Sequence, residues 1–233
     1  MTTNGEHPNG GTDRLIVAID GPSGAGKGTV ARAVAAQLGY RHIDTGAMYR
    51  ALAWKAVAEA LDLHDETAVA TLARTARIDV SDGAVSVDGA DVKRAIRTPE
   101  IDAAAAAVAR LPRVRDVLIV QQRAMGAAGG VVMEGRDIGT VVFPRADVKV
   151  YLDASPEERA RRRATDESHA AGRGTTAVAE VASALAARDN SDRTRAASPL
   201  TEASDALRID TTGVPIHEVV ARVMSLVKQK SAS

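Results

Sequence analysis

A glycine-rich stretch that contains a lysine lies between a short apolar run and a helical pattern near the start of the chain. Glycines let the backbone turn several N–H groups toward one anion, and a following helix adds its positive N-terminal end. The Lys27 ammonium can then reach the outer phosphates of a nucleotide. A turn that only caps a helix is the alternative, but the order of strand, loop, lysine and helix favours phosphate binding. The predicted phosphate-binding residues are Gly21, Pro22, Ser23, Gly24, Ala25, Gly26, Lys27, Gly28 and Thr29.

The position after the lysine departs from the usual pattern. A Ser or Thr normally follows the lysine and its hydroxyl binds magnesium, whereas this chain has Gly28 and then Thr29. The order Gly-Lys-Gly-Thr resembles that of nucleoside monophosphate kinases. The resemblance implies that Thr29 contacts phosphate and that Mg²⁺ is held largely by ATP oxygens and water, which suits an ion that dehydrates reluctantly. We therefore expect ATP to carry the Mg²⁺, and we assign the metal no protein ligand.

A second set of phosphate-binding residue types follows the next apolar run, in the segment Asp-Thr-Gly-Ala-Met-Tyr-Arg. Arg50 offers a planar fork that matches a phosphate, and Thr45 can cap a helix and also donate to an oxygen. Gly46 and Tyr49 lie in the same segment, so all four residues are candidates for binding a phosphate acceptor. From these residues alone, a helix cap at Thr45 and a solvent-exposed Arg50 are equally compatible with the pattern.

Four more segments carry charged residues in distinctive spacings: IRTPE at 96–100, LPRVRDVL at 111–118, EGRDIGTVVFP at 134–144 and RDNSDRTRAASPL at 188–200. Together with the first two segments they resemble the bacterial cytidylate kinase family, in order and with compatible spacing over residues 15–229. The resemblance implies an adenylate-kinase-like core with an enlarged acceptor-binding insert and a short lid. It also implies transfer of a phosphoryl group from ATP to CMP and dCMP, giving CDP, dCDP and ADP, in pyrimidine nucleotide metabolism.

The resemblance further implies three groups of acceptor-binding side chains. The cytosine pocket would contain Arg115, Arg136 and Asp137, the CMP phosphate would meet Thr45 and Arg50, and the sugar and phosphate would be held by Arg188, Asp192 and Arg195. An aspartate can accept a hydrogen bond from the cytosine amine but repels the uracil carbonyl. The alternatives are an ion pair or cap for the Arg-Asp dipeptide, and a solvated charge network for the last three residues. One departure is the alanine run 103–107, where family members can carry a hydroxyl that faces the base.

Four arginines lie on the helix expected after Ser155, which is a suitable N-cap. They are Arg159, Arg161, Arg162 and Arg163, and one helix cannot direct all four at the same ligand. By resemblance to the lid arginines of related kinases, Arg163 is expected at the transferring phosphoryl group, with Arg159 supporting ATP, while the other two face solvent. We expect no general base, because the acceptor is already a phosphate dianion near neutral pH. The expected catalytic residues are Lys27, Arg163 and Arg188.

Short apolar runs must position these residues, and they alternate with helical stretches. The expected strands are 15–19, 40–44, 131–134, 148–152 and 207–210. Strands alternating with helices favour an α/β fold, a P-loop architecture with a parallel sheet of five strands and helices on both faces. The segment 76–92 instead alternates apolar and polar residues around two Asp-Gly pairs, which predicts a small antiparallel β insert. Helices are expected at 99–110 and after Pro112.

These patterns predict one kinase domain at residues 14–229. Its core would comprise 14–62, 111–163 and 177–229, with an acceptor-binding insert at 63–110 and a lid at 164–176. The polar, glycine-rich residues 1–13 are expected to form a disordered tail, and residues 230–233 a frayed end.

Composition argues against several other classes of protein. Lys plus Arg and Asp plus Glu both number 30, so the chain has no net attraction to nucleic acid or acidic membranes. No apolar run approaches the roughly 20 residues that span a bilayer, cysteine is absent, and aromatic residues are few. We expect a cytoplasmic monomer that acts on small nucleotides, without nucleic acid or membrane. The alternatives are a kinase for UMP or another metabolite and a regulatory or nucleic-acid-dependent NTPase, although no strand ends in the acidic pair typical of the latter.

Overall fold

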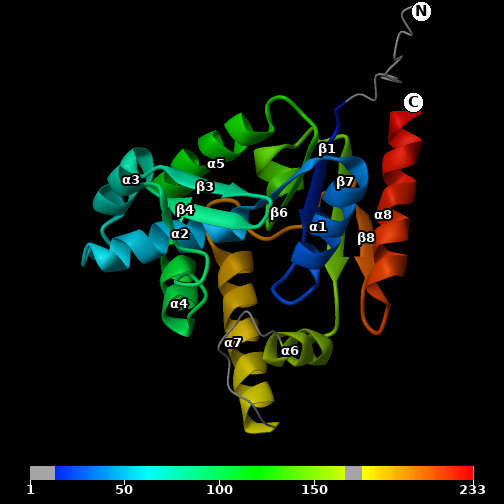
Figure 1. The fold of residues 1–233 in the computed structure, drawn as a ribbon. Coiled ribbons are helices and arrows are strands. Elements are labelled where there is room, and N and C mark those ends of the chain that lie inside the picture. The colour runs from blue at the N-terminus through cyan, green and yellow to red at the C-terminus, as the bar shows by residue number, and fades with distance from the viewer. Residues whose placement is uncertain (1–13, 166–174, 233) are drawn as a thin grey trace, which may run out of the picture.

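A parallel β-sheet forms the centre of the computed structural model, which describes residues 14–165 and 175–232 (Figure 1). The expected tail at 1–13 and residues 166–174 of the expected lid lie outside this part, as does Ser233. The sheet has five strands in the order β2-β6-β1-β7-β8, and all neighbouring strands are parallel. The strands are β1 (Ile16–Asp20), β2 (Arg41–Asp44), β6 (Val131–Gly135), β7 (Val148–Asp153) and β8 (Leu207–Asp210). The expected α/β fold is therefore confirmed, with each strand within one residue of its predicted bounds.

Both faces of the sheet are covered by helices, as the continuous apolar strands predict. Because side chains alternate along a strand, Val17 and Ile19 face one side of the sheet and Ala18 faces the other. The first side packs against α1 (Lys27–Leu38) and α8 (Ile216–Ser231), and the second against α2 (Thr45–Ala58) and α5 (Pro112–Gly126). Among the described residues, no helix is long and apolar enough to cross a bilayer.

Residues 66–108 form a compact addition on the α2 and α5 side of the sheet (Figure 1). It consists of α3 (Glu66–Thr75), the antiparallel strands β3 (Ile78–Ser81), β4 (Ala84–Val87) and β5 (Ala90–Asp91), and α4 (Pro99–Val108). Both Asp-Gly pairs sit in the turns with positive φ at each residue, which is the geometry that such pairs favour in tight hairpins. The expected small antiparallel β-sheet is therefore present.

Three further elements lie near the carboxyl edge of the sheet. A π-helical turn η1 (Ile138–Val142) follows β6, and α6 (Pro156–Ala164) and α7 (Thr175–Thr194) pack against each other after β7 (Figure 1). Ser155 caps α6 as expected, because its Oγ accepts a hydrogen bond from Glu158 N at 3.2 Å. These elements meet where ligands bind in open parallel sheets.

Candidate active site

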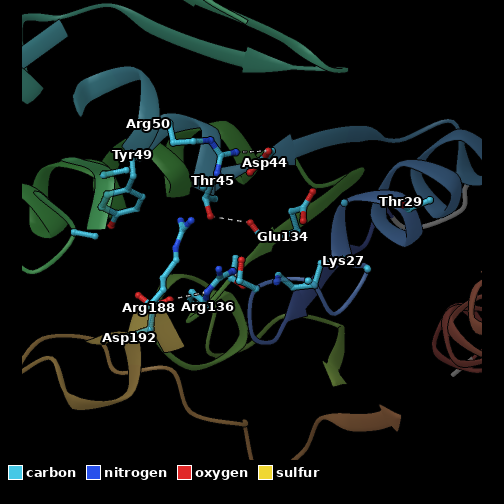
Figure 2. Close-up of a pocket in the computed structure, with 18 of the residues that line it drawn as sticks. Lys27, Thr29, Asp44, Thr45, Tyr49, Arg50, Glu134, Arg136, Arg188 and Asp192 are labelled. Carbon is cyan, nitrogen blue, oxygen red and sulfur yellow. Dashed lines mark hydrogen bonds and ion pairs between the residues drawn. The ribbon is translucent and has the colours of Figure 1, made fainter. Parts of the chain in front are cut away.

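A pocket of about 820 Å³ opens at the carboxyl ends of β1, β2 and β6. These strands are neighbours in the sheet, so the segments that follow them converge on one space. Figure 2 shows Lys27 at one end of this space, Arg188 and Asp192 at the other, and Glu134 between them. The pocket therefore holds the predicted phosphate-binding loop and most of the predicted acceptor-binding residues.

The phosphate-binding loop has the conformation that its glycines predict. Gly24 and Gly26 have φ values of 80° and 87°, a region that other residues rarely adopt. A Cβ on Gly21 would lie 2.0 Å from Leu152 O, and one on Gly24 would lie 2.9 Å from Arg159 Cβ. Glycine is therefore required both for the backbone angles and for close packing against β7 and α6.

Lys27 begins α1 and is buried at the floor of the pocket. Its Nζ donates a hydrogen bond to Pro22 O at 2.7 Å. Burial lowers the pKa of Lys27 to about 7; the charge of Arg136 lowers it further, while Glu134 and Asp189 act in the opposite direction. A bound phosphate would restore the proton, so the charge of Lys27 depends on what the loop holds.

The arginines of α6 divide their roles differently from the expectation. Arg159 does not line the pocket. It pairs with Asp189 and donates a hydrogen bond to Ser23 O at 3.0 Å, so it stabilises the phosphate-binding loop without facing the ligand space. Arg162, expected in solvent, lines the pocket and donates to Thr211 Oγ1 at 2.9 Å. Residues three apart share a helix face, so both face the donor loop. Arg161 is exposed, as expected.

Within the loop itself, three predicted residues shape the backbone without lining the pocket. They are Gly21, Pro22 and Ala25. Ser23, Gly24, Gly26, Lys27, Gly28 and Thr29 line the pocket as predicted.

The polar and charged side chains in the segment after β2 already have hydrogen-bond and ion-pair partners within the protein. Asp44, and not Thr45, caps α2, because its Oδ1 accepts from Ala47 N at 2.9 Å. Thr45 Oγ1 instead donates to Glu134 O at 2.7 Å, and buried Arg50 pairs with Asp44 at 3.1 Å. The helix cap at Thr45 and the exposed Arg50 are therefore both wrong, and both side chains line the pocket. Burial would raise the pKa of Asp44, but Arg50 and the N–H of Ala47 outweigh it and lower that pKa.

A buried pair of charges forms the inner wall of the pocket. Arg115 Nη2 lies 2.6 Å from Asp137 Oδ2, and Arg195 Nη2 lies 3.8 Å from Asp137 Oδ1. The Arg115 guanidinium also stacks over the Tyr49 ring, with 5.3 Å between its Cζ and the ring centroid. Asp137 makes no capping hydrogen bond to η1, so the cap alternative is wrong, and its ion pair is with Arg115 and not with Arg136.

Arg136 belongs to a second charge network and not to the wall formed by Arg115 and Asp137. Its Nε donates to Asp192 Oδ2 at 2.9 Å, and Arg195 Nη1 lies 3.4 Å from Asp192 Oδ1. Burial would raise the pKa of Asp192, but Arg136, Arg195 and Arg188 outweigh it and hold that pKa below its usual range. Asp192 and Arg195 are buried, Arg136 and Arg188 are half-buried, and all four line the pocket, which contradicts a solvated charged face.

The two arginines among the expected catalytic residues share one carboxylate. Asp102 on α4 lies 2.5 Å from Arg163 Nη2 and 3.3 Å from Arg188 Nη1. Burial and the neighbouring charge of Arg136 lower the pKa of Arg188 to about 10. The structure thus brings together Arg163 and Arg188, which come from different helices.

Sequence reasoning missed Glu134, which lies near the end of β6 and lines the pocket. Its Oε1 is 2.9 Å from His42 Nε2 and would be 3.2 Å from a Cβ placed on Gly28. A serine after Lys27 would therefore place its side chain in contact with this carboxylate. The sequence signal that could have identified Glu134 is an acidic residue at the end of a predicted strand.

A nucleotide phosphate loop therefore faces a second, arginine-lined anion site across one pocket, with more arginines between the two. Such an arrangement can bind two phosphate compounds and stabilise the charge that develops between them. The fold and the site define a phosphotransferase of the P-loop class.

Comparison with known proteins specifies the family. The family model described as cytidylate kinase matches residues 17–229. A cytidylate kinase from Desulfitobacterium hafniense is 49% identical over 219 residues, which cover 93% of this chain and 94% of that protein. A cytidylate kinase from Solibacter usitatus is 44% identical over 217 residues, which cover 93% of this chain and 94% of that protein. One from Pelotomaculum thermopropionicum is 47% identical over 217 residues, which cover 91% of this chain and 95% of that protein. The chain belongs to the cytidylate kinase family.

Proposed function

We propose that this chain transfers the γ-phosphoryl group of ATP to CMP and dCMP, giving ADP with CDP or dCDP, in pyrimidine nucleotide metabolism. Family membership supports this reaction, since the relatives carry the name cytidylate kinase. The observation that carries the choice of acceptor is the buried Arg115–Asp137 pair at the inner wall of the pocket.

Asp137 would read the amine edge of the base. A carboxylate can only accept hydrogen bonds, so it suits the amine of cytosine and disfavours the carbonyl of uracil. Among the residues that the structure describes, Arg115 Nε and Arg195 Nη2 are buried donors without a hydrogen-bond acceptor. Such groups need a partner, and the carbonyl oxygen and the ring-nitrogen acceptor of cytosine would supply one.

The wall contributed by α4 adds no hydrogen bonds to the base. Ala105 and Ala106 line the pocket there, within the alanine run 103–107 where family members can carry a hydroxyl. Base recognition would therefore depend on Arg115 and Asp137, and α4 would supply only apolar contact. Residues 63–110 would serve as the acceptor-binding part of the domain.

Phosphoryl transfer needs alignment and charge stabilisation more than covalent chemistry. Lys27 and the loop N–H groups would hold the ATP phosphates, and Thr45 and Arg50 the acceptor phosphate. Arg163 and Arg188, which share the Asp102 carboxylate, would stabilise the transferring group, and Arg188 with Asp192 and Arg195 would hold the acceptor's sugar and phosphate. A phosphate dianion attacks without deprotonation, so the reaction needs no general base.

ATP would bring the Mg²⁺ that neutralises charge on its outer oxygens. The described residues include no cluster of three or more His, Cys, Asp or Glu side chains suited to a metal ion. Gly28 offers no hydroxyl at the usual metal-binding position. These features fit an ion held mainly by ATP oxygens and water, and we propose no protein ligand to it.

The proposed enzyme is a cytoplasmic monomer that acts on free nucleotides, without nucleic acid or a membrane. The equal numbers of acidic and basic residues support the absence of a nucleic acid or acidic membrane partner, because the chain has no overall attraction to a polyanion.

The test replaces Asp137 with Asn, which keeps the size but can donate to the uracil carbonyl. A base contact provides about 1 to 3 kcal/mol of discrimination, so the CMP to UMP ratio of kcat/KM should fall by roughly 5- to 150-fold. The wild-type panel includes CMP, dCMP, UMP, AMP and GMP, and ATP alone. A wild-type preference for UMP would identify the alternative acceptor, and equal ATP hydrolysis with and without acceptor would indicate an NTPase. An unchanged ratio in folded Asp137→Asn protein would remove this residue from the base pocket.

A further inference from the structure

The turn that carries Asp137 is held from behind by a residue of another strand. Asp20, the last residue of β1, is buried, and no feature of the sequence singled it out. Its Oδ1 accepts from Ile138 N at 2.9 Å and its Oδ2 accepts from Gly139 N at 2.7 Å. N–H groups in the first turn of a helix have no carbonyl partner within it. Asp20 therefore caps η1 from a position more than a hundred residues earlier in the chain.

Asp137 itself occupies the N-cap position of η1. An aspartate at this position usually turns its carboxylate onto the N–H groups that follow it. Here it makes no such bond, and its carboxylate faces Arg115 and Arg195 in the pocket. Asp20 thus caps the turn, and the carboxylate of Asp137 remains available to contact the ligand.

We propose that Asp20 is a positioning residue for base recognition, which frees Asp137 for the ligand by capping η1 in its place. This inference rests on the proposed role of Asp137 in reading the base. Without Asp20, two buried N–H groups lose their acceptor, and Asp137 is already at the cap position where it can satisfy them. A carboxylate drawn onto the turn is withdrawn from the cytosine amine.

The residues around Asp20 support its contact with η1. A Cβ on Gly139 would lie 3.4 Å from Asp20 Oδ2 and 3.2 Å from Lys149 Cδ, so both side chains pack closely against the first turn of η1. Burial raises the pKa of Asp20 to about 6, while the bonds from Gly139 and Ile138 act against this. The carboxylate is therefore ionised in assays run above neutral pH. Asp20 also directly precedes Gly21, so it joins the turn of the base pocket to the start of the donor loop.

The experiment measures kcat/KM for CMP and UMP, above neutral pH, in Asp20→Asn, Asp137→Asn and the double variant. The asparagine that replaces Asp20 has the same size as the native side chain, but its NH₂ must face one of the two N–H donors. We expect the CMP to UMP ratio to fall at least about threefold in Asp20→Asn, with a higher KM for CMP. Because Asp20 acts through Asp137, the double variant should show the ratio of Asp137→Asn alone.

Lys149→Met is the matched control, because buried Lys149 also lies next to Gly139 but donates to Pro144 O and Asp205, not to η1. It should change stability and leave the ratio unaltered. If Asp20→Asn does not fold, Asp20→Ser, which leaves room for a water on the turn, gives the same comparison. An unchanged ratio in the folded variant, or falls that multiply in the double variant, would overturn the role of Asp20 alone. An unchanged ratio in Asp137→Asn would instead overturn the proposed base reading on which it rests.

Discussion

The donor end and the acceptor end of the pocket are built in different ways. The donor loop is one continuous segment after β1, and its shape follows from glycines at positive φ. The acceptor end is assembled from charge pairs between distant segments, such as Arg115 with Asp137 and Arg136 with Asp192. A local motif thus fixes the donor site, whereas only the tertiary fold can bring the acceptor site together.

The two ends also differ in their electrostatics. At the donor end, burial lowers the pKa of Lys27 to about 7, so its positive charge is weakly held near neutral pH. At the acceptor end, the arginines around Asp192 hold its pKa below the usual range, so that carboxylate stays charged. The donor site therefore depends on its ligand for a full charge, and the acceptor site is paired in advance.

The largest expected effect concerns the donor end. Lys27→Ala removes the cation that acts on the ATP phosphates, and loss of such a preorganised contact costs about 3 to 4 kcal/mol in the transition state. The measurement is kcat with saturating CMP, with circular dichroism as the check on folding. Activity above about a tenth of wild type would contradict the role, since a tenfold loss is only about 1.4 kcal/mol.

The next effect should be confined to the acceptor end. Asp192→Ala removes the carboxylate that Arg136 and Arg195 share, and a hydrogen bond to a charged group contributes about 1.5 to 3 kcal/mol. The KM for CMP should rise at least about tenfold while the KM for ATP stays nearly constant.

Asp205→Ala is the control for this variant, because Asp205 pairs with Lys149 and does not line the pocket. It should leave both KM values unchanged. Equal weakening of ATP and CMP in Asp192→Ala would show that the α7 network supports the whole pocket and does not distinguish the two ends.

The same contrast explains what the sequence could predict. The strands, the Ser155 cap and the donor loop depend on neighbouring residues, so apolar runs and local spacing were enough to predict them. The exchange of roles between Arg159 and Arg162 depends on which face of α6 meets the donor loop. The capping of η1 by Asp20 requires the pairing of β1 with β6, which no local pattern encodes.

The smallest expected effect is a pH dependence limited to the donor site. In the unliganded protein the pKa of Lys27 is lowered to about 7, so the ammonium is charged below that pH and loses its proton above it. ATP phosphates raise this pKa on binding, because they favour the charged lysine, so the protein takes up a proton together with ATP.

The Kd for ATP should therefore be lowest below about pH 7 and rise above it, approaching tenfold per pH unit at most. The last ionisation of the ATP phosphates, at about pH 6, only adds negative charge as the pH rises and therefore does not cause the weaker binding. Lys27→Arg is the control, since a guanidinium stays charged throughout this range and should give a nearly flat curve. The Kd for CMP should also be flat above about pH 7, because its phosphate is already a dianion. Calorimetric titration of ATP and CMP between neutral and alkaline pH gives both curves, and a rise in the ATP Kd that persists in Lys27→Arg would assign the titration to another group.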